Sequence, residues 1–225
     1  MTTRRVYAAA AIITWFGVLF GLVLAIFNVY PPTEVAVGAL GNNAEGIAGL
    51  FGRVFDSFSY FTNLSNILVA VVFTMLAINT SRNGAMWNAI RMDSLVMITI
   101  TGLIYVIVLA PDAQVEGLDI IVNTIKHYIV PVMTVVLWLI LGPRKQLTFI
   151  SVFTALIIPI AWAGLTLIRG AVISGYPYGF LNVVEHGLPT VLTNIVGVAV
   201  LGIVLGVVFW AVDRLITHLT ASRSV

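Results

Sequence analysis

The chain has 225 residues, of which 60% are hydrophobic and only 9% charged, and its formal net charge is +2. An ordinary soluble domain carries roughly 25% charged residues, so this composition excludes a typical water-soluble protein and indicates a membrane protein. The absence of cysteine excludes disulfides, thiolate metal sites and a cysteine nucleophile, and so small a net charge gives no reason to expect a nucleic-acid partner.

Six apolar runs are long enough to cross a bilayer, which requires about 20 helical residues. In chain order they cover residues 6–29, 60–79, 90–110, 120–141, 147–169 and 189–216. The first run is not followed by a small-residue cleavage site, so it is predicted to be a retained helix rather than a cleaved signal peptide. No separate soluble domain remains, so residues 1–225 are predicted to form one all-α, six-helix transmembrane bundle.

Positive charges favour one side of this bundle. The short connections and termini predicted on that side contain Arg4, Arg5, Arg82, Arg91, Arg144, Lys145, Arg214 and Arg223. The connections on the other side carry most of the acidic residues, which are Glu34, Glu45, Asp56, Asp112, Glu116 and Asp119. The positive-inside rule therefore places both termini in the cytoplasm and the starts of the second and fourth helices toward the outer leaflet.

The outer connections carry the strongest turn and loop signals. Residues 30–59 are rich in glycine, and residues 46–55 are expected to form a short helix at the membrane interface. Pro111 is expected to end the third helix, and the segment Gly175-Tyr176-Pro177-Tyr178-Gly179 is a turn signal.

Polar residues gather at the start of the second helix. Ser59, Thr62, Asn63 and Asn66 are three or four residues apart, which places them on one helix face, opposite Phe61. A lone threonine in a membrane helix most often bonds back to its own helix, and asparagines often join neighbouring helices. Four polar residues at one depth also fit a functional site, so both interpretations stay open.

The start of the fourth helix contains a histidine in a polar setting. His127 follows Asn123 by four residues and precedes Pro131 by four. Proline has no N–H to bond the carbonyl four residues earlier, so the His127 carbonyl is expected to lack its helical partner. Histidine serves as acid, base or ligand near neutral pH, although it also suits a helix end that faces lipid headgroups.

Further polar groups lie at the outer ends of the last two helices. Glu185 lies four residues before Pro189, as His127 does before Pro131, and His186 follows it. Either side chain is a candidate to orient His127 or to bind a ligand. Arg169 either extends to the interface or recognises a carboxylate. A metal site needs three or four converging ligands, and no histidine spacing supports one, so no metal and no cofactor is expected.

Three segments resemble those of a known family. FSYFTNLSNILV opens the second helix, IKHYIVPVM the fourth, and YPYGFLNVVEHG precedes the sixth. In this order they are similar to segments of the androgen-induced and androgen-dependent six-helix membrane hydrolases and their bacterial relatives. The resemblance implies a threonine–histidine hydrolase of fatty-acid esters of hydroxy fatty acids, with Thr62 as nucleophile and His127 as base.

The expected function is therefore that of an intramembrane lipid esterase in a bacterial plasma membrane, with a membrane lipid or fatty-acyl ester as its substrate. Tyr60, Asn63 and Asn66 are candidate donors to the oxyanion, while Asn123 and Glu185 are candidates to orient His127. The alternatives are a non-catalytic lipid- or quinone-binding protein and a small-solute transporter. A transporter would need polar residues through the full membrane depth, whereas the inner halves of the second and fourth helices are apolar.

Overall fold

A computed structural model describes residues 2–29 and 34–221. Within these ranges the regular structure is helical: α1 (Thr2–Phe27), α2 (Leu50–Ser59), α3 (Phe61–Ile78), α4 (Ala85–Ile104), η1 (Tyr105–Leu109), η2 (Ala110–Asp112), α5 (Asp119–Thr124), η3 (Ile125–Ile129), α6 (Val130–Leu141), α7 (Phe149–Thr154), α8 (Ile157–Ile173), η4 (Gly179–Leu181) and α9 (Val183–Ala221). The turns η1 and η3 are π-helical, whereas η2 and η4 are 3₁₀-helical.

The prediction of six membrane-length helices is confirmed. Continuous helical stretches long and apolar enough to span a bilayer cover Thr2–Phe27, Phe61–Ile78, Ala85–Asp112, Asp119–Leu141, Phe149–Ile173 and Val183–Thr220. The sixth begins earlier than predicted, because the chain is already helical before Pro189 and kinks at Gly187, whose φ is 74°. Large apolar side chains face outward, including Val196 at 61% and Val200 at 53% exposed, as expected for an integral multi-pass membrane protein.

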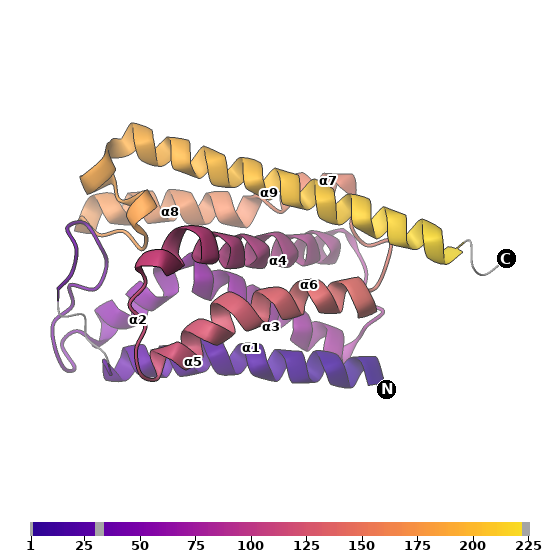
Figure 1. The fold of residues 1–225 in the computed structure, drawn as a ribbon, viewed down its shortest axis with the longest axis horizontal. Coiled ribbons are helices and arrows are strands. Elements are labelled where there is room, and N and C mark those ends of the chain that lie inside the picture. Colours follow the sequence, from indigo (N-terminus) through magenta and orange to yellow (C-terminus); the bar gives the residue numbers. More distant parts are fainter. Residues whose placement is uncertain (1, 30–33, 222–225) are drawn as a thin grey trace.

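The helices form one elongated bundle (Figure 1). α3 packs against α1 and α4, while α4 also contacts α6 and α9, and α8 packs on α9. The N-terminal end of α1 and the C-terminal end of α9 lie at the same end of the bundle, and α2 and α5 lie at the opposite end (Figure 1).

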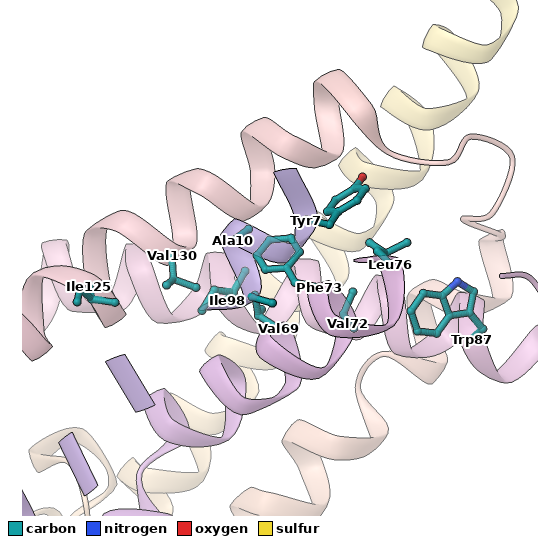
Figure 2. Packing of buried hydrophobic residues seen from close by; sticks show 11 residues of the cluster. Tyr7, Ala10, Val69, Val72, Phe73, Leu76, Trp87, Ile98, Ile125 and Val130 are labelled. Carbon is teal, nitrogen blue, oxygen red and sulfur yellow. The ribbon is translucent and has the colours of Figure 1, made fainter. Parts of the chain in front are cut away.

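A buried apolar cluster fixes the spacing of the central helices. Figure 2 shows Tyr7 of α1 beside Phe73 of α3, whose ring centroids are 6.0 Å apart. Ile98 of α4 and Val130 of α6 are fully buried in the same cluster. Lipid tails are as apolar as these side chains, so close van der Waals packing between the helices, rather than exclusion from water, stabilises the cluster. The cluster thereby holds α3 and the helix formed by η3 and α6 at a fixed separation.

The interface helix is found slightly later than predicted. α2 covers residues 50–59 rather than 46–55, and it ends in a break at Tyr60, whose φ and ψ are −76° and 130°. Ser59 therefore belongs to α2 and not to the polar face of α3; its hydroxyl donates to the Phe55 carbonyl of its own helix. The prediction of one helical stripe from Ser59 to Asn66 is wrong at its first member, because the extended residue Tyr60 interrupts the helix.

Candidate active site

The structure brings Thr62 and His127 together. Thr62 is the second residue of α3, and His127 lies in the middle of η3. Thr62 Oγ1 is 3.2 Å from His127 Nε2, which is within hydrogen-bond reach for a nucleophile and its base. Thr62 is 8% exposed, so the hydroxyl is largely enclosed by protein.

Both positions owe their geometry to local interruptions of helix. At the start of α3, Trp162 Nε1 donates to the Ser59 carbonyl at 3.0 Å, which holds the break between α2 and α3 against α8. At His127, Pro131 cannot donate to the carbonyl four residues earlier, and the chain widens into a π-helical turn at that place. π-Helical turns occur frequently at functional sites, and this one turns the imidazole toward Thr62.

Asn123 orients the imidazole. His127 Nδ1 is 2.8 Å from Asn123 Oδ1, one turn earlier on the same helical segment. An amide oxygen only accepts hydrogen bonds, so Nδ1 carries the proton and the lone pair of Nε2 faces Thr62. The Tyr105 ring stacks on the imidazole with centroids 3.8 Å apart and an interplanar angle of 14°. Asn123 and Tyr105 together fix the tautomer and the plane of the base.

Tyr178 completes the surroundings of Thr62, and the sequence analysis missed it. The Tyr178 hydroxyl accepts a hydrogen bond from the Thr62 N–H at 3.1 Å and lies 3.2 Å from Thr62 Oγ1. It thus satisfies one of the backbone N–H groups that a helix leaves free at its N-terminus. Burial raises the pKa of the Tyr178 phenol to about 12, so the hydroxyl remains a donor at neutral pH. The only sequence signal was its place in a Tyr-Pro-Tyr turn.

The two asparagines of α3 do not supply the predicted oxyanion donors. Asn66 Nδ2 donates to the carbonyls of Thr62 at 2.8 Å and Lys126 at 3.3 Å. Asn63 Nδ2 donates to the Ser57 carbonyl at 2.6 Å, while Asn63 Oδ1 accepts from Lys126 Nζ at 2.7 Å. Because their N–H groups are engaged by the protein, these side chains position α3 against its neighbours instead.

Tyr60 remains beside the site. Its ring meets the Tyr178 ring edge-on, with centroids 5.5 Å apart, and burial raises the pKa of its phenol. Tyr60 and Lys126 both line the polar cavity next to Thr62, so each is placed to contact a molecule bound there. Lys126 is 6% exposed and gives this cavity a cationic group that the sequence analysis did not single out.

Arg169, Glu185 and His186 lie away from the pair. Arg169 does bind a carboxylate, as one prediction had it, but the carboxylate belongs to Asp56 of α2, so the guanidinium fastens α8 to α2. Glu185 and His186 are exposed, and their side chains approach each other to 3.9 Å. None of the three lines a cavity that contains Thr62. Asn123, rather than Glu185, is the group that orients His127.

Two cavities of different character meet at Thr62. The first has a volume of about 70 Å³ and is lined mainly by apolar residues of α4, α8, η4 and α9. The second, of about 330 Å³, contains Asn123, Lys126 and His127 and extends toward the loop before α5. Thr62 and Tyr178 line both cavities. A hydroxyl at this junction can contact a hydrocarbon chain on one side and a polar group or water on the other.

Among residues 2–29 and 34–221, no three histidine, aspartate or glutamate side chains converge as metal ligands would. The site combines a hydroxyl, an oriented imidazole and a neighbouring hydroxyl donor, which are groups that acyl transfer can use.

Comparisons with protein-family models, with curated proteins and with solved structures return no match.

Proposed function

We propose that this chain is an intramembrane lipid esterase, which hydrolyses fatty-acyl esters with Thr62 as nucleophile and His127 as base. The observation that carries the proposal is the 3.2 Å contact between Thr62 Oγ1 and His127 Nε2 at the junction of an apolar and a polar cavity. The similarity of three segments to the six-helix threonine hydrolases supports the same assignment of these two residues.

In the first half of the reaction, His127 Nε2 takes the proton of Thr62 Oγ1 as this oxygen attacks the ester carbonyl carbon. The carbonyl oxygen becomes an oxyanion, and the Tyr178 hydroxyl, 3.2 Å from Thr62 Oγ1, is a neighbouring neutral donor that can stabilise it. The carbon–oxygen bond to the alcohol then breaks, and His127 returns its proton to the departing alkoxide. The products of this half are an alcohol and an acyl-threonine.

In the second half, water replaces the alcohol in the polar cavity. His127 takes a proton from this water as its oxygen attacks the acyl carbon, and a second oxyanion forms. When that intermediate collapses, Thr62 Oγ1 leaves and recovers its proton from His127. The fatty acid is released, and Asn123 Oδ1 stabilises the positively charged imidazole in both halves by accepting the hydrogen bond from His127 Nδ1.

The test compares purified wild type with Thr62→Ala and His127→Ala on a p-nitrophenyl acyl ester. The matched controls are Thr99→Ala, whose hydroxyl only bonds back to the Leu95 carbonyl, and His218→Ala near the end of α9. We expect both site variants to lose at least about 1000-fold in kcat, and both controls to keep the wild-type rate. Hydrolysis by wild type that is no faster than by the two site variants would refute the esterase and favour a lipid-binding protein without turnover.

The location of the site is part of the proposal. The distribution of Lys and Arg supports cytoplasmic termini, and with them a site toward the outer leaflet of a bacterial plasma membrane. The chain has no cysteine, so single cysteines can be introduced at the exposed residues Ser81 and Glu116. We expect an impermeant maleimide to label Glu116→Cys in intact cells and Ser81→Cys only after permeabilisation; the reverse pattern would refute this orientation.

A further inference from the structure

A groove on the outside of the bundle lies between the end of the third span and α9. Its volume is about 340 Å³, and it is lined by Ile104, Val108, Phe180, Thr193, Asn194, Gly197, Val198 and Leu201. The neighbouring side chains Val196 and Val200 of α9 are 61% and 53% exposed and apolar, as lipid-facing positions are. The groove therefore opens toward the hydrocarbon of the bilayer.

The groove adjoins the apolar cavity that ends at Thr62. Ile104, Phe180 and Val198 line both spaces. Because the two spaces share these side chains, a long chain that begins in the cavity at Thr62 can continue into the groove. The two spaces are thus neighbours along a line from the lipid-facing flank of α9 to Thr62.

Phe180 stands at the passage between the two spaces. Its ring stacks on that of Tyr178 with centroids 5.4 Å apart and an interplanar angle of 11°. Its carbonyl accepts a hydrogen bond from Asn194 Nδ2 at 2.8 Å, which ties η4 to α9. A chain that displaces the Phe180 ring would therefore also act on Tyr178, which contacts Thr62.

We infer that the groove and the apolar cavity form the binding site for the acyl chain of the ester, which enters sideways from the bilayer. This inference rests on the proposed function and specifies its substrate as an ester of a long-chain fatty acid. The alcohol part lies in the polar cavity with Lys126, and water reaches the acyl-threonine there. After hydrolysis the fatty acid returns to the bilayer, and the alcohol leaves by the polar side.

The first test fills the groove without touching Thr62 or His127. Gly197 lines the groove, and a Cβ added to it meets no atom within 4 Å, so Gly197→Phe fits the backbone and occupies the path. The matched control is Gly164→Phe on α8, where an added Cβ also meets nothing within 4 Å and no described cavity is lined. Activity is measured on p-nitrophenyl palmitate and on p-nitrophenyl butyrate, whose short chain needs little of the groove.

We expect Gly197→Phe to lower kcat/KM for the palmitate by at least about 10-fold and to change that for the butyrate by less than about 2-fold. Gly164→Phe should hydrolyse both esters as wild type does. Equal losses for the two esters, equal losses in the two variants, or no loss at all would overturn the inference.

A second test does not depend on turnover. The Thr62→Ala variant, with a photoreactive diazirine analogue of palmitate bound noncovalently, is irradiated. The labelled peptides are then identified by mass spectrometry. Label on residues 193–201 of α9 that disappears in the Thr62→Ala, Gly197→Phe double variant supports the path. Label confined to residues 115–127 of the polar cavity overturns it. If wild type hydrolyses neither ester, the proposed function fails, and this labelling still decides whether the groove binds an acyl chain.

Discussion

Asn123 offers a quantitative test of the proposed base, because it contacts His127 but neither Thr62 nor the attacked carbon. In Asn123→Ala the hydrogen bond of 2.8 Å between His127 Nδ1 and Asn123 Oδ1 is lost. In the resting enzyme that bond joins two neutral groups and contributes about 0.5–1.5 kcal/mol. When His127 takes the proton of Thr62, the imidazole becomes positively charged, and the same bond contributes about 1.5–3 kcal/mol.

The difference between the two states, about 1–1.5 kcal/mol, is stabilisation that exists only once the proton has moved. Its loss lowers kcat by roughly 5- to 13-fold, since about 1.4 kcal/mol corresponds to a factor of ten. The affinity for substrate should change little, because the ground state loses only the weaker neutral bond. Asn123→Asp keeps an acceptor at the same place and should retain the wild-type rate or exceed it.

The assay is steady-state hydrolysis of a p-nitrophenyl ester, with kcat and KM determined separately. Asn79→Ala is the matched control, since the Asn79 side chain also accepts one local hydrogen bond, from the Ser81 N–H, at the far end of α3. If Asn123→Ala keeps kcat within about twofold of wild type, or if Asn123→Asp is as impaired as Asn123→Ala, Asn123 does not orient a catalytic base.

Three further outcomes are expected. Tyr178→Phe should lower kcat by roughly 100-fold while KM changes little, because the hydroxyl 3.2 Å from Thr62 Oγ1 is the proposed oxyanion donor; an unchanged kcat would remove it from the mechanism. Burial raises the pKa of the Tyr178 phenol to about 12, above the unfolded value of about 10. The folded state therefore holds this proton more tightly, and the stability of the protein should fall as pH rises from about 10 to about 12. In thermal unfolding, the melting temperature of Tyr178→Phe should fall less over this pH range than that of wild type. Gly170→Ala places a Cβ 2.0 Å from the Tyr176 ring and should destabilise the protein by about 1–3 kcal/mol. Gly164→Ala is the control: its Cβ has no atom within 4 Å, so the change should be neutral or stabilising. Equal melting temperatures for the two variants would contradict the packing at Tyr176.

The sequence by itself determined the class of the protein and the number and approximate positions of its spans. The length and hydropathy of a membrane helix are local properties, because each span satisfies its own backbone hydrogen bonds and needs only enough apolar residues to cross the bilayer. Local rules also predicted the irregular start of the fourth span, since Pro131 removes a helical donor whatever surrounds it. The spacing of Asn123 and His127 placed both on one face, and the structure joins them.

Only the tertiary structure decided which polar groups meet. Thr62 and Tyr178 are 116 positions apart in the chain, and their contact depends on how the loop before η4 packs against the start of α3. The amides of Asn63 and Asn66 are engaged by Ser57, Lys126 and the backbone, and no sequence pattern reveals how such hydrogen bonds are distributed between helices.

The same reason explains the residues that were predicted near the site and lie elsewhere. Arg169 forms an ion pair with Asp56 because α2 lies beside the end of α8. Glu185 and His186 stand at the exposed start of α9, ahead of the kink at Gly187. Sequence fixes what each side chain can do chemically and which face of its helix it occupies, but the packing of separate helices decides which of these groups come within hydrogen-bond distance of one another.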